Sequence, residues 1–485
     1  MNHVLKFTFV SFLFILTLNG CALLKKKENI SKGPFAKKEL VEDLNYLKNA
    51  VIQTHPITLN PTWNNKLEAF TSRVEQIKGE EISVFEYENA IREAISLIGC
   101  YHTYVIKSPL EDLLLKKIGD SGNNFFYPLR LFIDSSGLYI IDLESEKLNP
   151  SIQFPIKVDS INGLGSQEII YALCCRYPQD NYQKTLAYKI LNEHGAYFLR
   201  LQFYNAKTLL VKGRSESGEI LELNLDAVQT YKNKRFKYYQ PKGKPIVKEK
   251  DVSLFDLDSV SSYLKLESVS YENYQLIHDT IFNHLISNKK KNLIIDLRGN
   301  GGGSQIVYLD LLSHLSIDTF RIEMVKRDES GLNYFNSKRR KDKPSKKFYN
   351  YSKKIENGTK YFSNPLPAKT KIFKGKLYVL IDGGTASAAS QLTSFLKNKM
   401  GAICIGQETG GGETGNNGHG YDQLVLPNSK ISINWPRYFV KLDLSIPINH
   451  RGVKPTFEIK YDPKNYLLNH DLDMEKAFQL IGVSN

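Results

Sequence analysis

Hydrophobic residues recur at steps of three and four over residues 35–115, which predicts a helical region there. The apolar face of the first helix ends before Pro56 and consists of Leu40, Leu44, Leu47 and Val51. The face of the second consists of Trp63, Leu67, Phe70, Val74 and Ile77. The third helix is expected to begin at Ser83, which forms a capping-box pair with Glu86, and to end at Gly99. His102 lies just beyond the last of these helices.

Short apolar runs replace the helical spacing over residues 120–240, and they predict a β-rich module. The expected strands are Leu129–Ile133, Leu138–Leu143, Ile156–Ile161, Tyr197–Tyr204 and Ile220–Leu225. The turn Asp159–Gly163, followed by an apolar helix around Ile169, resembles the strand-turn-helix of a PDZ domain. Another small β-rich module is the alternative. The stretch Lys232–Lys250, rich in Lys and Pro, is expected to be an exposed linker.

Helical and strand patterns alternate over residues 250–485, which predicts an α/β domain. The expected elements are helices over Tyr271–Ser287, Gln305–Leu315 and Ala386–Met400 and strands over Asn292–Leu297, Lys376–Ile381 and Ala402–Gly406. With 485 residues the chain exceeds what one hydrophobic core usually organises, so division into domains is expected.

The N-terminal segment has the pattern of an export signal. Residues Phe7–Leu18 form an unbroken apolar and hydroxyl run behind Lys6, too short to span a bilayer. The following Leu18–Cys21 resembles the lipobox of bacterial lipoproteins, in which the chain is cut before the cysteine and its thiol is acylated. We therefore expect a signal peptide over residues 1–20, lipid attachment at Cys21 and a basic linker over residues 21–34. A core helix with a buried cysteine is the alternative.

Composition is that of a folded protein, with 41% hydrophobic and 24% charged residues. The net charge of +14 is partly local, because the stretch Lys338–Lys354 contains nine basic residues and a single acidic residue, Asp342. This stretch is either a basic binding surface or a solvated insertion. No nucleic-acid-binding motif accompanies the charge, so nucleic acid is not an expected partner. Cysteine and histidine spacing indicates neither a disulfide framework nor a metal site.

Two predicted strands end in segments of related character. The strand Asn292–Leu297 runs into a glycine-rich segment whose free backbone N–H groups can face a ligand. The strand Lys376–Ile381 runs into a turn that opens a helix and carries Ser387 among small residues. A hydroxyl placed at such a turn is exposed, and its neighbours leave room for a peptide. The glycine-rich segment fits neither the dinucleotide-binding nor the P-loop pattern.

Three blocks of the sequence, Asp296–Gly302, Thr385–Ala388 and Gly406–Gly412, together resemble the tail-specific, or C-terminal processing, protease family. Arg451–Pro455 resembles the closing segment of that family. The resemblance implies an α/β catalytic domain with crotonase-like strand-turn-helix repeats and a serine-type peptidase that needs no cofactor. It implies a protein or peptide substrate, which a PDZ-like module would hold by strand addition.

Carried over residue by residue, the resemblance makes Ser387 the nucleophile. The oxyanion hole is then the backbone N–H of Ala388 with that of Gly302 or Gly301. Better-known members of the family use a lysine twenty-five residues after the serine, where this sequence has Gly412. A branch similar to the tricorn protease takes its base from an N-terminal histidine instead. Its signature falls on Cys100–Thr103 and implies that His102 is the general base.

The sequence departs from that branch at the residues that support the base. Tyr101 stands where a serine orients the histidine, Cys100 replaces an acidic residue, and Asn449 stands about where a glutamate is expected. Tyr101 and Asn449 are therefore the supporting residues that the resemblance implies. The departures leave open a catalytically reduced peptide-binding lipoprotein with the same fold, and an anchored scaffold that uses the basic stretch. The expected location is a membrane facing the bacterial periplasm or cell surface.

Overall fold

A computed structural model describes residues 34–59, 80–113, 126–143, 152–180, 183–228, 235–326, 334–335, 352–354, 360–363, 369, 371–447 and 451–482. Several sequence predictions lie outside these described residues: the signal peptide, the lipid-attachment residue Cys21, the second N-terminal helix, most of the basic stretch and Asn449. Among the helices that the structure describes, none has both the length and the apolar composition needed to cross a membrane.

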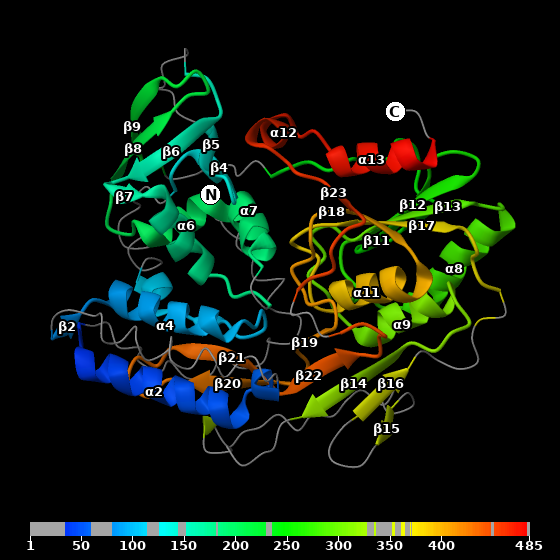
Figure 1. Cartoon of the computed structure of the whole chain (residues 1–485), viewed down its shortest axis with the longest axis horizontal. Coiled ribbons are helices and arrows are strands. Elements are labelled where there is room, and N and C mark those ends of the chain that lie inside the picture. The colour runs from blue at the N-terminus through cyan, green and yellow to red at the C-terminus, as the bar shows by residue number, and fades with distance from the viewer. Residues whose placement is uncertain are drawn as a thin grey trace, which may run out of the picture.

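The largest sheet lies in the C-terminal half of the chain and has the order β10-β11-β12-β13-β17-β18-β23 (Figure 1). The strands from β12 to β23 pair in parallel, and β10 and β11 are antiparallel. Their bounds are β10 Val247–Lys248, β11 Val252–Asp256, β12 Ser261–Leu266, β13 Asn292–Asp296, β17 Lys376–Ile381, β18 Ile403–Gly406 and β23 Phe457–Glu458. The predicted α/β domain is confirmed.

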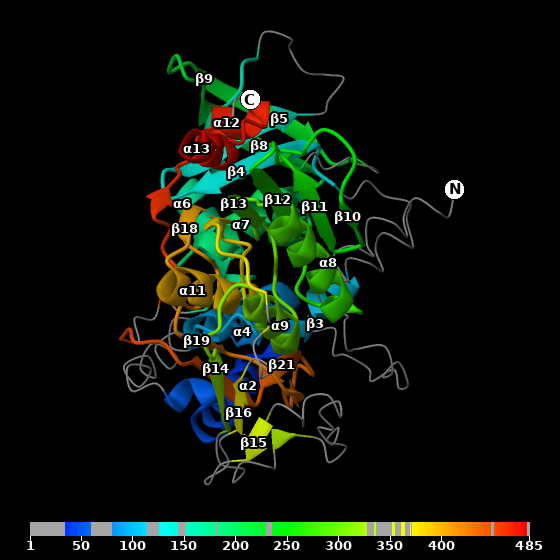
Figure 2. The ribbon, with the colours of Figure 1, turned by 90° about the vertical axis from the view of Figure 1, so that its right-hand side faces the viewer.

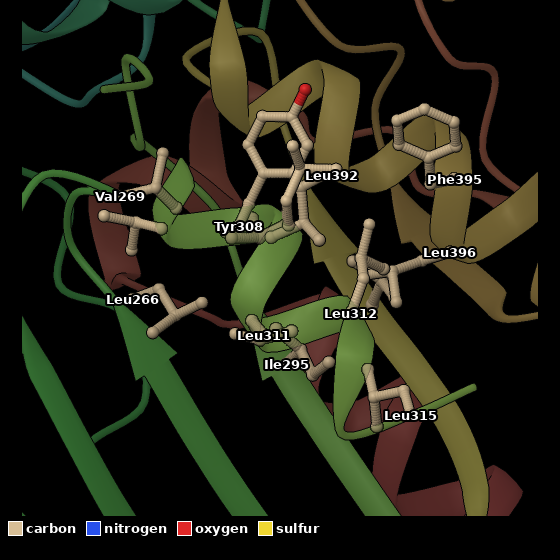
Figure 3. Packing of buried hydrophobic residues seen from close by; sticks show 14 of the residues in the cluster. Leu266, Val269, Ile295, Tyr308, Leu311, Leu312, Leu315, Leu392, Phe395 and Leu396 are labelled. Atoms are coloured by element: carbon tan, nitrogen blue, oxygen red, sulfur yellow. The ribbon is translucent and has the colours of Figure 1, made fainter. Parts of the chain in front are cut away.

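Helices cover both faces of this sheet (Figure 1). One face carries α8 (Tyr274–Ser287), α9 (Gln305–Ser313) and α11 (Ala388–Met400), whose apolar residues pack on Leu293 and Ile295 of β13. Figure 3 shows this core, with Tyr308 and Leu311 of α9 between Ile295 and Leu392 of α11. The other face carries α13 (Leu472–Ile481), which packs on Ile294. The short α12 (Pro463–Leu468) precedes α13. Because β13 is buried on both faces of the sheet, its central residues are all apolar.

The β-rich module contains an antiparallel sheet of order β4-β5-β6-β8-β9 with two helices beside it. The strands are β4 Leu129–Asp134, β5 Gly137–Leu143, β6 Ile156–Ile161, β7 Leu164–Gly165, β8 Thr208–Arg214 and β9 Ile220–Asp226, and the helices are α6 Ser166–Cys175 and α7 Thr185–Gln202. The predicted turn before α6 is present, with positive φ at Asn162 and Gly163. The PDZ-like assignment of the module remains a prediction.

The predicted strand Tyr197–Tyr204 is wrong, because most of this run belongs to α7. A short apolar run does not by itself distinguish a strand from a buried helical face. Ala187, Leu191, Phe198 and Leu199 are buried on the side of α7 that packs on β4. A Cβ at Gly195 would lie 2.7 Å from Leu131 Cδ1, so the helix approaches the sheet closely. Tertiary packing therefore overrides the aromatic, β-favouring composition of the run.

The predicted linker Lys232–Lys250 is mostly exposed in its described part, residues 235–250, but it also contributes buried residues to the fold. Phe236 is buried against Tyr461 and Tyr466, and Val247 belongs to β10. The Tyr238 hydroxyl donates a hydrogen bond to Asp382 Oδ2 at 2.8 Å. The lysines and prolines that suggested exposure are interleaved with aromatic residues that the fold buries.

The N-terminal helices pack on strands from near the end of the chain. The region begins with β1 (Phe35–Ala36), α2 (Lys37–Thr54) and the 3-10 turn η1 (Pro56–Leu59), and continues with β2 (Glu81–Ile82), α4 (Val84–Ile98) and β3 (Val105–Lys107). The predicted caps of α4 are confirmed: Ser83 and Glu86 form a capping box, and Gly99 adopts a left-handed conformation. Both helices share a core with β20 (Tyr421–Val425) and β21 (Ser432–Pro436), as Figure 1 shows.

Two smaller sheets complete the fold. One has the order β20-β21-β3. The other has the order β15-β16-β14-β22-β19, with bounds Ser352–Lys354, Lys360–Ser363, Arg321–Lys326, Tyr438–Leu442 and Gly415–Asn417. Figures 1 and 2 place β8 and β9 at one end of the molecule and β15 and β16 at the other, with the large sheet between them.

Candidate active site

Ser387 lies at the carboxyl edge of the large sheet. β13 and β17 are parallel neighbours, with Asp296 paired to Leu380, so the segments that follow them emerge side by side. The segment after β17 turns sharply and enters α11 at Ala388. Ser387 has φ 51° and ψ −125°, a conformation that non-glycine residues rarely adopt. A strained serine between a strand and a helix is the geometry of a nucleophile elbow, which exposes the hydroxyl.

Glycines leave the space that this turn needs. Gly302 has φ +110°, and a Cβ there would lie 2.7 Å from Ser387 Cβ and 2.9 Å from the backbone nitrogen of Ala388. A Cβ at Gly411 would lie 2.7 Å from the backbone nitrogen of Ser387. Backbone from two other segments therefore packs directly against the serine.

Asp382 ties the two strand ends together. Its Oδ1 accepts hydrogen bonds from the N–H groups of Gly299 at 2.8 Å and Gly384 at 2.9 Å. Thr385 Oγ1 donates to the carbonyl of Leu297 at 2.8 Å, which adds a second link between the segments. The glycine-rich segment and the serine turn are thus one hydrogen-bonded unit.

His102 reaches Ser387 from the N-terminal region. Gly99 ends α4, and β3 then pairs with β21. Asn434 of β21 donates from Nδ2 to the carbonyl of His102 at 2.7 Å, which fixes the backbone of the histidine. His102 Nε2 lies 3.1 Å from Ser387 Oγ, within hydrogen-bond reach of a general base.

Burial sets the charge of His102. The side chain is 7% exposed, and desolvation lowers its pKa to about 4, opposed by the nearby carbonyl of Asn417. The imidazole is therefore neutral at pH 7. We assign its proton to Nδ1, which leaves the Nε2 lone pair free to accept the Ser387 hydroxyl proton. The rings of Tyr101 and Tyr421 contact the imidazole.

The three predicted oxyanion donors differ in whether their N–H groups already have a hydrogen-bond acceptor. The Gly302 N–H donates to Asn300 Oδ1 at 3.0 Å. Within the described part of the chain, no acceptor contacts the N–H of Ala388 or of Gly301. Of the three predicted donors, these two therefore keep an N–H group without an acceptor among the described residues.

Of the two predicted supporting residues, Tyr101 is described and Asn449 is not. The Tyr101 ring meets the His102 ring edge-on, with centroids 4.8 Å apart. Its backbone N–H donates to Oδ1 of Asp180 at 2.9 Å. Asp180 is 3% exposed and lies between α6 and α7. Sequence reasoning missed it, because no motif surrounds it and the chain contains 51 acidic residues.

Two groups of described residues bring potential metal-binding atoms within 4.8 Å of one another. In the first, Cys100, His102 and Asp180, the Cys100 thiol is protonated because burial raises its pKa. The second group consists of His278, Asp310 and His314. It is part of a hydrogen-bond network, in which His278 Nδ1 lies 2.6 Å from Asp310 Oδ2 and His278 Nε2 lies 2.6 Å from the Tyr271 hydroxyl. We assign the first group to proton transfer and the second to structure. Neither was visible in the sequence, since each joins separate segments.

A buried ion pair joins the β-rich module to the site. Lys189 Nζ of α7 lies 3.0 Å from Asp382 Oδ2, and both side chains are about nineteen-twentieths buried. Desolvation by itself would raise the pKa of Asp382 and lower that of Lys189. The attraction between the two charges outweighs it, so the pKa of Asp382 is lowered and that of Lys189 is raised. The same carboxylate therefore holds the serine turn, the glycine-rich segment and α7.

Lys189→Met is expected to lower the free energy of unfolding by about 3–5 kcal/mol, because it leaves the Asp382 carboxylate buried without a cation. Urea unfolding followed by circular dichroism measures the change. Lys212→Met on β8 is the control, since Lys212 forms an exposed pair with Glu222 and should cost at most about 1 kcal/mol. Equal unfolding midpoints for the two variants would contradict the role of the buried pair.

Comparison with known proteins agrees with this geometry. Residues 261–459 match the sequence model of peptidase family S41. The fold is similar to two crystal structures of mature CPAF. The one complexed with lactacystin has 14% sequence identity and a TM-score of 0.60, over 92% of this chain and 98% of that chain. The other has 13% identity and a TM-score of 0.58, over 92% and 97%.

A weaker likeness, with a TM-score of 0.40 and 13% identity, exists to the photosystem II D1 C-terminal processing protease, over 88% of this chain and 94% of that one. A comparison with curated proteins found no significant match. The family match spans both segments that meet at Ser387, and the CPAF fold extends the likeness over nearly the whole chain. Residues 261–459 therefore match a peptidase family S41 domain, and the chain as a whole has the fold of the CPAF structures.

Proposed function

We propose that the protein is a serine endopeptidase that hydrolyses peptide bonds in exported proteins or peptides, with Ser387 as nucleophile and His102 as general base. The observation that carries the proposal is the 3.1 Å distance between His102 Nε2 and Ser387 Oγ. The two residues lie 285 positions apart in the sequence.

The geometry supports an acyl-enzyme course. Neutral His102 accepts the hydroxyl proton while Ser387 Oγ bonds to the scissile carbonyl carbon. The negative charge that forms on the carbonyl oxygen is bound by the N–H groups of Ala388 and Gly301, and each such donor typically contributes about 10²-fold or more. The imidazolium then protonates the leaving amine as the peptide C–N bond breaks. Water, deprotonated by the same imidazole, hydrolyses the ester and frees Ser387.

The alternative is a peptide-binding lipoprotein with reduced catalysis. Strain at Ser387 favours the enzyme, because a non-glycine residue in such a conformation costs about 1–3 kcal/mol and is usually kept where function requires it. The sequence pattern of residues 1–21 supports export and lipid attachment at Cys21, which would hold the enzyme at a membrane surface facing the periplasm or cell exterior. A PDZ-like module beside the site would present an extended substrate.

A fluorophosphonate probe tests the proposal, because it forms a covalent bond only with an activated serine. The wild-type protein should be labelled, and Ser387→Ala should not. Ser390→Ala is the matched control. Its hydroxyl lies one helical turn away and donates only to the Ser387 carbonyl, so labelling should persist. Absent labelling of the wild type, or equal labelling of Ser387→Ala, would favour the binding protein.

A further inference from the structure

Asp180 brings a carboxylate into the active site from the connection between α6 and α7. Its Oδ1 accepts the Tyr101 N–H at 2.9 Å, one residue before His102 in the sequence. One of its oxygens, a His102 ring nitrogen and Cys100 Sγ all lie within 4.8 Å of one another. The backbone N–H of Gly412 also favours its ionised form.

Two polar atoms in this small space have no hydrogen-bond partner among the described residues. They are His102 Nδ1 and Asp180 Oδ2, and both are fully buried. The Nδ1–H is the group that becomes more acidic when His102 takes the proton of Ser387, and a carboxylate oxygen is its natural acceptor. The Tyr101 N–H holds the carboxylate through Oδ1, which leaves Oδ2 without a partner in the same small space as the ring.

We propose that Asp180 is the positioning residue of His102: its carboxylate orients the imidazole through Nδ1 and stabilises the imidazolium that forms as Ser387 attacks. This inference rests on the proposed serine peptidase function. It makes the site a Ser-His-Asp arrangement in which the acidic member comes from the β-rich module. The geometry also explains how the site dispenses with an acidic residue at position 100.

The connection that carries Asp180 is fixed to the catalytic domain. Gln183 Nε2 donates to the carbonyl of Thr409 at 2.8 Å, and its Oε1 accepts the Gly452 N–H at 2.6 Å. A Cβ at Gly383 would lie 2.0 Å from the Thr185 carbonyl oxygen, so α7 begins in direct contact with the serine turn. The chain that resumes at Gln183, three residues after Asp180, is therefore anchored to the catalytic domain.

The other titratable groups that face the pair stay neutral around pH 7. They are Cys100 and Tyr101 beside His102, Tyr104 before β3, Tyr177 on the Asp180 connection and Tyr421 of β20, and burial raises the pKa of each. Burial raises the pKa of Asp180 to about 7 and lowers that of His102 to about 4. Among the described groups here, Asp180 is therefore the one that changes charge near neutral pH.

The pH dependence of the reaction is set by the charge of the Asp180 carboxyl. Below pH 7 the carboxyl is protonated and cannot stabilise an imidazolium, whereas above pH 7 it is a carboxylate and can. The labelling rate of Ser387 by the fluorophosphonate is therefore expected to rise about tenfold per pH unit up to about pH 7 and then to level off.

The test is the labelling rate of wild type and Asp180→Asn from pH 5 to pH 9. Asparagine keeps the Oδ1 acceptor for Tyr101 but cannot ionise. The variant is expected to be about 10²–10⁴-fold slower at pH 8.5 and to lose the acid limb near pH 7. Asp159→Asn is the control in the same module, because Asp159 forms an exposed pair with Arg214; its rate and profile should match the wild type.

Wild-type rate and profile in Asp180→Asn would overturn the proposal. Failure of the wild type to react, or equal labelling of Ser387→Ala, would instead overturn the serine peptidase function and the role of Asp180 with it. If Asp180→Asn does not fold, ¹³C NMR of the assigned Asp180 carboxyl in folded Ser387→Ala decides: a pKa above 5 at Asp180 supports the proposal, and one at or below 5 overturns it. The signal must be assigned to Asp180, because burial raises the pKa of Asp473 to about 7 as well.

Discussion

Replacement of His102 by glutamine is expected to slow fluorophosphonate labelling of Ser387 by about 10⁴-fold or more. Glutamine can reach Ser387 Oγ from a similar distance and fill the same buried space, but its amide has no basic lone pair. The hydroxyl then keeps its proton, and the alkoxide that attacks the probe does not form. The residual rate reflects the strained turn and the oxyanion donors alone.

The measurement compares second-order labelling constants at pH 8.5, where the Asp180 carboxyl is ionised and the wild type is expected to be fully active. His470→Gln is the control, because the His470 side chain is about half exposed and pairs with Glu475. It should label at the wild-type rate. A His102→Gln rate within tenfold of the wild type would show that another group deprotonates Ser387, and would remove the histidine from the mechanism.

The sequence predicted those parts of the fold that short-range physics controls. Ser83, Glu86 and Gly99 cap α4 as expected, because a capping box and a left-handed glycine act within a single turn of helix. The strands β13 and β17 follow from apolar runs bounded by glycine-rich turns, and the parallel pairing of their ends follows from the alternation with helices. The nucleophile turn is local in the same sense.

Local sequence patterns did not predict the contacts between segments that are distant in the chain. Nothing near Asp180 marks it as different from other acidic residues, since its role depends on the Tyr101 N–H and on the path between α6 and α7. The pairing of Lys189 with Asp382 likewise joins a helix and a strand end that no motif connects. The helix over Tyr197–Gln202 was missed because packing on β4, and not local composition, decides its conformation.

The site has two halves with separate supports. Asp382 holds Ser387 and the glycine-rich segment within the S41 domain. The pairing of β3 with β21 and the Asn434 contact hold His102 from the N-terminal region. The Oγ1 atom of Thr103, the residue after His102, lies 2.7 Å from His55 Nε2, and this contact also fixes the segment. Catalytic geometry therefore depends on the fold joining residues from both ends of the chain.

Gly302→Ala is expected to lower the labelling rate of Ser387 by about 10²–10³-fold while the protein remains folded. The added Cβ would lie 2.7 Å from Ser387 Cβ, 2.9 Å from the Ala388 nitrogen and 3.0 Å from the Ala386 carbonyl oxygen. None of these atoms is the end of a flexible side chain, so the serine turn must shift away. That shift displaces both the nucleophile and the Ala388 N–H that binds the oxyanion.

Gly299→Ala separates this collision from ordinary backbone strain. Gly299 lies in the same segment with φ +72°, but a Cβ there meets no atom within 4 Å. Its cost should be limited to about 1 kcal/mol of strain, with labelling close to the wild type. Labelling rates and thermal unfolding of the two variants together decide the matter. Loss of labelling in Gly302→Ala alone, with similar melting temperatures, places the defect at Ser387, whereas parallel losses of activity and stability in both variants would attribute it to unfolding of the segment.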